Sequence, residues 1–288
     1  MNYNFLTTNY KLLLTGSSGQ VGCEMLPLLR EIGHVWAPTR NEFDLSNLNS
    51  LPSKVQQYKP NIIINLAAYT DVEGAEIDST SAKYINHLAP SVLAKEANKL
   101  KIPLIHFSTD YVFDGTKGTS YNETDTPNPL NVYGQTKLNG EKEIERNHDK
   151  YLIIRVAWIY NKKKGKNFFR TIANLCKTKN IIDVVEDEIG NPTSAQFIAK
   201  KISSIISQIY CVETTKNKWG IFHLVEESSM SRFDFACNIL NEIKHEHGIV
   251  VQKINPIKRH EYKTIANRPQ NSVLDTQKFY KTFQVNGK

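Results

Sequence analysis

The sequence predicts a doubly wound α/β fold, a parallel sheet with helices on both faces. Two observations support this. Short runs that are apolar throughout, such as 11–16, 62–68 and 103–109, alternate with segments whose apolar residues recur at helical spacing. A glycine-rich turn separates the first apolar run from the first helical segment. Strands without polar alternation are typical of a sheet buried on both faces, and a glycine turn at this place is typical of a Rossmann-type dinucleotide-binding fold.

The expected elements follow in chain order. Strands are expected at 11–16, 34–40, 60–68, 103–109 and 151–160, and helices at 19–33, 47–59, 81–101 and 133–147. After residue 160 the pattern loosens, with helices near 167–178, 194–210 and 231–245 and short strands near 181–185, 221–225 and 249–253. We therefore expect a Rossmann-type NAD(P)-binding domain over 11–160, which also takes back part of 190–225. Residues 161–288 would form mostly a smaller α/β substrate-binding lobe.

Composition narrows the class of protein. The chain has 288 residues and a formal net charge of +7, from 36 Lys and Arg against 29 Asp and Glu. No apolar run approaches the ~18 residues of a membrane span, and no signature of a nucleic-acid-binding module is present. The four cysteines contain no Cys-x-x-Cys pair, which argues against a zinc site and fits a reducing compartment. We expect a cytoplasmic protein that binds neither membrane nor nucleic acid, with an anionic small molecule as its partner.

The turn Gly16-x-x-Gly19-x-x-Gly22 predicts a phosphate-binding site. Gly16 permits a tight turn, Gly19 lets the backbone approach a pyrophosphate, and Gly22 lets the helix lie close to the strand. The first backbone N–H groups of the helix would then face the phosphates. Because the motif stands between a strand and a helix, it has the context that a dinucleotide site requires.

The second strand carries the information on cofactor type. The acidic residue that usually holds the adenosine ribose is not evident in "WAPTRNEFDLSN". Arg40 stands where a 2′-phosphate would be met, and Asp44 follows at the adenine end. This favours NADPH, with NADH as the alternative.

The chemistry is predicted from two stretches. The fourth strand ends in Ser108, Thr109 and Asp110, at the edge of the sheet where the cofactor should lie. Tyr133 and Lys137 are four residues apart and share one face of a helix. A nearby ammonium would lower the tyrosine pKa from near 10 towards neutrality. Thr109 would then polarise a carbonyl while Tyr133 supplies a proton during hydride transfer.

With these residues in place, the chain resembles the extended short-chain dehydrogenase/reductases, and within them the dTDP-4-dehydrorhamnose reductases. The resemblance covers roughly residues 11–280. It rests on "GSSGQVG", "NLAAYTDVEGAE", "STDYVF", "YGQTK", "RVAWIY", "NFFRTI", "GNPTSAQ", "FHLVE" and "NRPQNSVLD". The resemblance implies an NAD(P)H-dependent reductase acting on the 4-keto group of a nucleotide-linked 6-deoxy sugar.

The resemblance also implies roles for individual residues. The pyrophosphate would be held by Gly16, Ser18, Gln20 and Val21, with Gly19 and Gly22 of the same turn. Asp44 and Leu45 would lie beside the adenine, and Ala67, Ala68 and Tyr69 along the cofactor. Thr109, Tyr133 and Lys137 would be catalytic, with Lys137 also bonding the nicotinamide ribose. The substrate would meet Thr70, Asp110, Trp158, Arg268 and Asn271.

Simpler roles stand beside several of these. Asp110 is also a common turn former, and Trp158 is also a candidate for core packing. Arg268 would equally form a structural ion pair, and Asn271 would equally cap a local turn. The basic run at 162–166 is favoured as a solvated loop over a diphosphate clamp.

Some members of this family join subunits through a magnesium ion held by glutamates. Glu24 matches one such position, but Gln196 stands where a second glutamate would be expected. We therefore expect no such metal bridge, while a homodimer formed by other contacts stays open.

Two other functions are compatible with the sequence. One is a bifunctional 3,5-epimerase/4-reductase acting on a UDP-4-keto-6-deoxyglucose. Asp110 disfavours it, because related bifunctional enzymes have a cysteine just after the catalytic Ser or Thr. The other is a non-catalytic, NADP-binding regulatory subunit of the methionine adenosyltransferase type. The intact Thr109, Tyr133 and Lys137 disfavour that function.

Overall fold

The computed structural model describes residues 10–211 and 218–284. Its centre is a six-stranded sheet in the order β10-β5-β4-β3-β1-β2, with every neighbouring pair parallel. The strands are β1 (Lys11–Thr15), β2 (His34–Trp36), β3 (Ile62–Asn65), β4 (Leu104–Thr109), β5 (Tyr151–Val156) and β10 (Gly220–His223). The strand order reverses direction beside β1, so the carboxyl ends of β1, β3 and β4 form the edge at which ligands of this fold bind.

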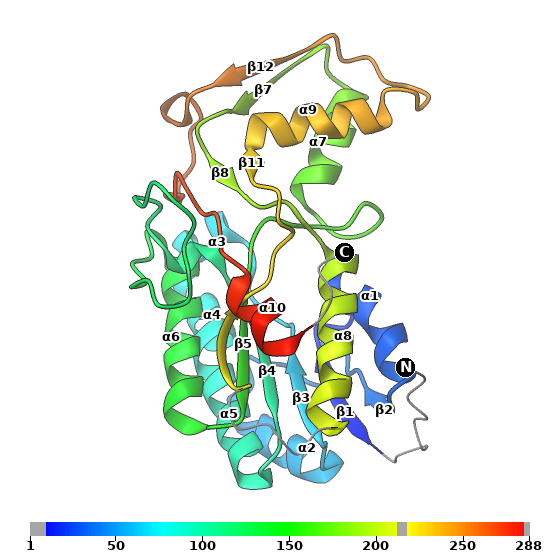
Figure 1. Cartoon of the computed structure of the whole chain (residues 1–288), viewed down its shortest axis with the longest axis vertical. Coiled ribbons are helices and arrows are strands. Elements are labelled where there is room, and N and C mark those ends of the chain that lie inside the picture. Colours follow the sequence, from blue (N-terminus) through cyan, green and yellow to red (C-terminus); the bar gives the residue numbers. More distant parts are fainter. Residues whose placement is uncertain (1–9, 212–217, 285–288) are drawn as a thin grey trace.

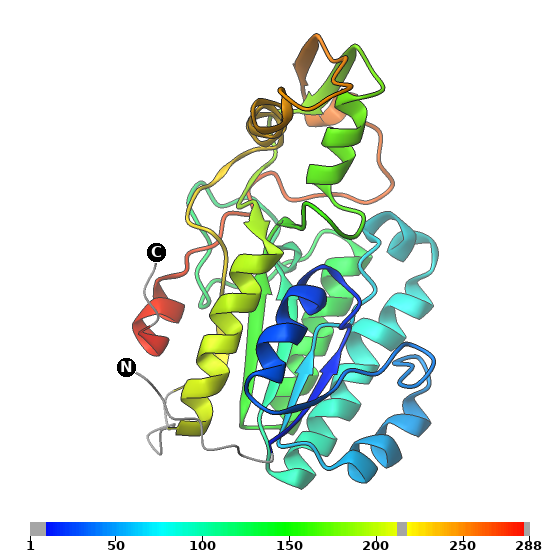
Figure 2. The ribbon, with the colours of Figure 1, turned by 90° about the vertical axis from the view of Figure 1, so that its right-hand side faces the viewer.

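Helices cover both faces of the sheet, as Figures 1 and 2 show. One face is covered by α1 (Gln20–Arg30) and α8 (Ala195–Cys211), with α10 (Gln277–Phe283) at its margin. The other face is covered by α2 (Leu51–Tyr58), α5 (Ala89–Leu100) and α6 (Val132–Asn147). This arrangement confirms the predicted fold class.

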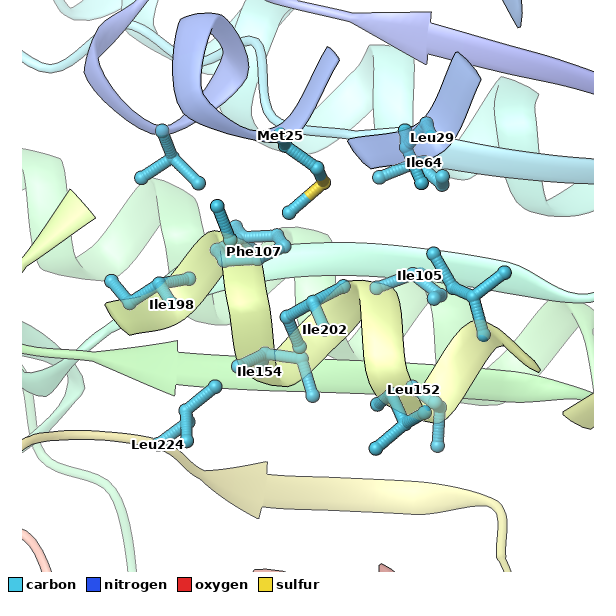
Figure 3. Packing of buried hydrophobic residues seen from close by; sticks show 14 of the residues in the cluster. Met25, Leu29, Ile64, Ile105, Phe107, Leu152, Ile154, Ile198, Ile202 and Leu224 are labelled. Carbon is cyan, nitrogen blue, oxygen red and sulfur yellow. The ribbon is translucent and has the colours of Figure 1, made fainter. Parts of the chain in front are cut away.

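Alternate side chains of each strand supply the two cores. Ile105 and Phe107 of β4 pack with Met25 of α1 and Ile202 of α8, as Figure 3 shows. Leu104 belongs to the core on the opposite face. Each fully buried side chain of this kind contributes about 1.5–3 kcal/mol relative to an exposed one, which explains the strands without polar alternation.

A second, smaller layer lies beyond the carboxyl ends of the strands (Figure 1). It contains α7 (Phe168–Cys176), α9 (Arg232–Ile243) and the parallel pair β7 (Ile181–Val185) and β12 (Lys253–Ile257). These elements share a core of their own. In chain order, α7 and β7 of this layer are followed by α8 and β10, which belong to the sheet, and then by α9 and β12 of the layer. β10 pairs with β5.

The remaining elements are short. They are α3 (Val72–Ile77), α4 (Ser79–Lys83), β6 (Ile159–Tyr160), β8 (Ile189–Gly190), β9 (Thr193–Ser194) and β11 (Met230–Ser231), a π-helical turn at Tyr84–Leu88 and 3₁₀ turns at Leu48–Ser50, Asp110–Val112 and Arg259–Glu261. β6 pairs with β9, and β8 with β11.

Three expected strands differ most from the structure, while the others differ by at most three residues at an end. β2 ends at Trp36, two residues before Pro38, which lacks the N–H that a ladder needs. The expected strand 151–160 is interrupted at Trp158, whose φ of 44° turns the chain between β5 and β6. The strand expected at 249–253 lies at Lys253–Ile257 instead, because the N–H groups of Val250 and Val251 donate to the carbonyl of Cys176 at the end of α7.

The helix expected at 81–101 begins at Ser79, where Asp78 accepts a hydrogen bond from the N–H of Ser81. It then widens into the π-helical turn Tyr84–Leu88 just before Pro90. Proline removes one backbone donor and crowds the preceding turn, and a π turn accommodates both effects.

Cys23, Cys176 and Cys237 carry free thiols. The side chain of Cys211 and residues 1–9 lie outside the described residues. Within the described ranges, no helix is both long and apolar enough to cross a membrane.

Candidate active site

The glycine turn forms a cradle that side chains would fill. Gly16 has a φ of 70°, and an added Cβ would lie 2.7 Å from the backbone nitrogen of Ala67. At Gly22 a Cβ would lie 2.2 Å from the carbonyl oxygen of Gly16. Gly19 caps α1 without any side-chain hydrogen bond, so the first N–H groups of the helix are left for an anion. The residues present therefore fit a dinucleotide pyrophosphate.

We expect Gly22→Ala to weaken NADPH binding by about tenfold or more, because overpacking of about 1–3 kcal/mol would push α1 away from the turn. Gly118→Ala is the matched control, since no heavy atom of the described residues lies within 4 Å of a Cβ added there. Titration by NADPH fluorescence measures both variants. Equal affinities would show that the close contact at Gly22 is not needed for the cofactor.

The basic run packs against this turn. Asn167 donates from Nδ2 to Gln20 Oε1 at 2.7 Å, and a Cβ on Gly165 would lie 2.7 Å from Gln20 Cγ. Lys162 pairs with Glu242 at 2.6 Å. The loop is thus held on the glycine turn rather than standing free in solvent, although its lysine side chains are exposed. Ser18 of the turn is exposed and Val21 is buried.

The segment that follows β3 lies beside the glycine turn, since the backbone of Ala67 approaches Gly16. Its residues Ala67, Ala68 and Tyr69 are partly buried, and Thr70 is exposed. Asn86 fixes this segment. Its Oδ1 accepts from the N–H of Tyr69 at 2.8 Å, and its Nδ2 donates to the carbonyl of Tyr69 at 3.0 Å. Sequence analysis missed Asn86, since a buried asparagine inside a π turn has no signature of its own in one sequence.

Arg40 and Asp44 follow β2. Arg40 is exposed, and Leu45 is buried. Asp44 accepts from the N–H of Ser46 at 2.9 Å, and this hydrogen bond lowers the pKa of its carboxyl. Arg40 adds a smaller attraction in the same direction.

The three residues with predicted chemistry come from β4 and α6. Thr109 ends β4, where its hydroxyl donates to Asp110 Oδ1 at 3.0 Å. Tyr133 lies in the first turn of α6, which Asn131 caps by accepting from the N–H of Gly134 at 2.8 Å. Lys137 follows one turn later and is buried. Thr109 Oγ1 also accepts from the N–H of Tyr111 at 3.2 Å, and the ring of Tyr111 packs edge-on against Tyr133 at 5.9 Å between ring centres.

The electrostatics of Tyr133 contradict the expectation from sequence. Burial raises its pKa above the ordinary value, and the charges of Asp110 and Tyr111 add to this, while the bond with Thr109 opposes it. The ring keeps some exposed surface but is surrounded by protein atoms. Lys137 does not lower the pKa of this phenol, because its ammonium donates to the carbonyl of Phe107. Burial lowers the pKa of Lys137 itself to about 8.

Asp110 is buried beside these groups. Burial raises its pKa to about 6, against hydrogen bonding from Ser272 and Thr109 and the charge of Arg232. Asp110 also opens the 3₁₀ turn, where its carbonyl accepts from the N–H of Phe113 at 3.1 Å.

We expect Asp110→Asn to stabilise the protein at pH 7. A carboxyl whose folded-state pKa is raised costs folding free energy as the pH rises from its unfolded value, near 3.8, through about 6. The gain should be on the order of 2 kcal/mol at pH 7 and should almost vanish near pH 3, below the unfolded pKa, where the acid is mostly neutral in both states. Urea unfolding at both pH values measures it. An equal gain at both would rule out charge burial as the cause.

Trp158 is held by two contacts that sequence analysis missed. The guanidinium of Arg232 lies 3.5 Å from the centre of the indole ring, a cation–π contact. A Cβ on Gly190 would lie 2.4 Å from Trp158 Cε2. These contacts fix the indole, which keeps part of its surface exposed. The backbone of Trp158 is strained, with a positive φ. Only the tertiary fold brings residue 232 to residue 158.

Arg268 and Asn271 are engaged within the chain. Arg268 pairs with Glu73 at 2.6 Å, and Asn271 donates to the carbonyls of Lys117 and Thr119 at 2.6 and 3.1 Å. The Arg268 contact matches its simpler role as an ion pair. Asn271 caps a local turn by accepting at Oδ1 from the N–H of Val273 at 3.1 Å, while its Nδ2 holds the distant 117–119 segment. Arg268 also lines a polar cavity of about 700 Å³, together with Asp187, Arg259, His260, Tyr262, Lys263, Thr264, Asn267 and Gln270.

The two positions considered for a metal bridge have different surroundings. Glu24 accepts from Asn161 Nδ2 at 2.9 Å, and Gln196 is exposed.

Comparison with known proteins places this site in a family. The model of the RmlD substrate binding domain matches residues 10–288. The chain is 38% identical to the dTDP-4-dehydrorhamnose reductase of Aggregatibacter actinomycetemcomitans, over 96% of this chain and 94% of that protein. It is 36% identical to the reductase of that name from Salmonella typhimurium, over 95% and 92%.

Solved structures agree. The dTDP-4-dehydrorhamnose reductase of Bacillus anthracis, in complex with NADP, superposes with a TM-score of 0.85 at 30% identity, over 95% of this chain and 93% of that one. A UDP-glucose 4-epimerase of Thermus thermophilus, at 14% identity and a TM-score of 0.75, shares the fold. Sequence and structure together show that the chain belongs to the dTDP-4-dehydrorhamnose reductase family.

Proposed function

We propose that this protein is an NADPH-dependent oxidoreductase that reduces the 4-keto group of dTDP-4-dehydro-L-rhamnose to give dTDP-L-rhamnose. The proposal rests on a cluster of three side chains in a protein of this family. Thr109, Tyr133 and Lys137 gather at the carboxyl ends of the parallel strands, beside a glycine cradle shaped for a dinucleotide. Reductases of this name are 36–38% identical to the chain over almost its full length.

Each of the three side chains has a chemical task. Bound NADPH would supply the hydride to the carbonyl carbon. The hydroxyl of Thr109 would turn its proton from Asp110 Oδ1 to the carbonyl oxygen and polarise it by a hydrogen bond, and the phenol of Tyr133 would donate the proton that this oxygen gains. Lys137 presents an ammonium that would orient the nicotinamide ribose.

The raised pKa of Tyr133 suits this direction of the reaction. A buried phenol stays protonated at neutral pH, so the acid form that must donate is the resident one. The proton leaves only when the carbonyl oxygen develops negative charge beside it. The role of Lys137 then lies in holding the cofactor, since Lys137 does not lower the pKa of the phenol.

We assign substrate binding to residues close to the three catalytic side chains. Asp110, Trp158 and Thr70 would contact the sugar, with Asp110 able to bond hydroxyl groups and the indole to stack on the ring. Arg268 is the candidate for the diphosphate, provided that it exchanges its contact with Glu73 for the ligand.

Arg40 is proposed to recognise the 2′-phosphate. We expect Arg40→Ala to raise KM for NADPH by about tenfold, the usual scale for a hydrogen bond to a charged group, and to leave KM for NADH nearly unchanged. Initial rates with each cofactor measure the ratio. Arg30→Ala, which removes a charge from the far end of α1, is the control. A parallel change for both cofactors would exclude phosphate recognition by Arg40.

The proposal is tested by identifying the product. The protein is incubated with NADPH and dTDP-4-dehydro-L-rhamnose, and NMR should show the signals of dTDP-L-rhamnose. The epimerase/reductase alternative predicts exchange of the protons at C3 and C5 with deuterated water when no cofactor is added. Because the relatives reported above are named as reductases, we expect no enzyme-dependent exchange.

A further inference from the structure

Four buried polar side chains form a continuous chain beneath the active site, and the proposed reaction uses only the last. Thr15 Oγ1 lies 2.6 Å from Asn65 Oδ1, Asn65 Nδ2 lies 3.0 Å from His106 Nδ1, and His106 Nε2 lies 3.3 Å from Lys137 Nζ. They come from β1, β3, β4 and α6. Each is at most 3% exposed.

Hydrogen-bond chemistry allows this chain only two directions. If Asn65 presents its amide nitrogen to His106, Nδ1 must accept and the neutral ring carries its proton on Nε2. That N–H points at Lys137, so the lysine must then be an uncharged amine that accepts it.

In the second direction Lys137 is an ammonium and donates to His106 Nε2. The ring proton then sits on Nδ1 and is donated to the oxygen of Asn65, whose amide has turned over and donates to Thr15 Oγ1. Turning a buried amide exchanges its oxygen and nitrogen without moving any other group. The charge of Lys137, the tautomer of His106 and the orientation of Asn65 are therefore one coupled variable.

We propose that His106 is a positioning residue that holds the Lys137 ammonium through Nε2, and that the His106–Asn65–Thr15 chain reverses direction when Lys137 loses its proton. The inference rests on the proposed function, because it assigns the support of that reaction's lysine. His106 works as a neutral ring throughout, since burial and the Lys137 charge hold its own pKa well below the ordinary value.

Within residues 10–211 and 218–284, few other groups face the Lys137 ammonium. From β4, the carbonyl of Phe107 accepts one of its protons. From its own helix, Glu141 favours the charged form, but Glu141 is itself bound by Arg155 of β5.

Those contacts leave His106 as the ring that holds the ammonium from the strand side, and Tyr133 as the titratable group on the cleft side of the same helix. Asn65 of β3 and Thr15 of β1 carry no charge. Loss of the acceptor at His106 Nε2 should therefore make the ammonium less stable and Lys137 easier to deprotonate.

Two substitutions at His106 each retain the hydrogen bond of one ring nitrogen and remove that of the other. His106→Gln places an amide oxygen near the position of Nε2 and can still accept from Lys137. His106→Asn places its amide near Nδ1, keeps the bond to Asn65 and withdraws the acceptor from Lys137. We expect the alkaline limb of kcat to move to lower pH by about one unit in the Asn variant and to stay near the wild-type position in the Gln variant.

The second measurement needs no turnover. NMR of the wild-type protein, labelled on its histidine ring nitrogens, should show His106 with its proton on Nδ1 at about pH 6 and on Nε2 at about pH 10, on either side of the Lys137 pKa. The signal is assigned by its loss in His106→Gln.

A single tautomer across this range overturns the proposal, whether or not any sugar is reduced. Coincident pH profiles for the Asn and Gln variants also overturn it. If the tautomer reverses but no keto sugar is turned over, the proposed function fails and the proton chain stands. Poor folding of either variant leaves the decision to the wild-type spectrum.

Discussion

Replacing Tyr133 by phenylalanine should lower kcat by about 100-fold or more, the usual scale for loss of a general acid. The ring would still pack edge-on against Tyr111, at 5.9 Å between ring centres, so the fold of this wall should persist. NADPH binding should also persist, because the glycine cradle is untouched. Steady-state rates together with a fluorescence titration separate the two effects.

Tyr111→Phe is the matched control, because it removes a neighbouring phenol hydroxyl from the same buried wall. We expect its kcat to stay within a few-fold of wild type. Near-normal turnover by Tyr133→Phe would remove Tyr133 from the role of proton donor. An equal loss in both variants would point to general damage of the cleft.

Replacing Glu141 by leucine should have the largest effect on stability. Arg155 donates to both oxygens of Glu141, at 3.0 and 2.6 Å, and neither side chain is more than 2% exposed. The pair fixes α6 to β5 one turn beyond Lys137. Breaking a buried pair by removing one partner costs about 3–5 kcal/mol, because the other charge stays buried without compensation.

The double variant Glu141→Leu, Arg155→Met tests that cause. It removes both charges and should recover most of the lost free energy of unfolding, because apolar pairs of similar volume are often as stable as the ion pair. Urea unfolding of the wild type, both single variants and the double variant measures the coupling. A double variant whose loss equals the sum of the single losses would mean that the stranded charge is not the reason.

Much of the fold could be predicted because local chemistry determines it. The fully apolar strands, the helix that follows the glycine turn, and β7 at 181–185 all lie where the pattern placed them. The strand expected at 249–253 is misplaced because of a distant contact. Val250 and Val251 have strand-forming side chains, but their N–H groups are taken by the carbonyl of Cys176, some 70 residues earlier. The local sequence around Val250 does not show that a distant carbonyl takes these N–H groups.

The site divides in the same way. The spacing of Tyr133 and Lys137 predicted a shared helix face, which α6 provides. The direction of the Tyr133 pKa shift was wrong, since spacing cannot tell how deeply a phenol is buried or that Lys137 bonds to Phe107. Glu73 with Arg268 and Arg232 with Trp158 pair across long stretches of chain, so only the folded protein reveals them.

The most direct test of the whole account is the initial rate of NADPH oxidation with dTDP-4-dehydro-L-rhamnose, with the UDP analogue offered separately. We predict oxidation of NADPH with the dTDP sugar that depends on both protein and sugar, and slower oxidation with the UDP analogue. Failure to oxidise NADPH with either sugar, by protein that still binds NADPH, would contradict the assignment of Thr109, Tyr133 and Lys137 to this reduction.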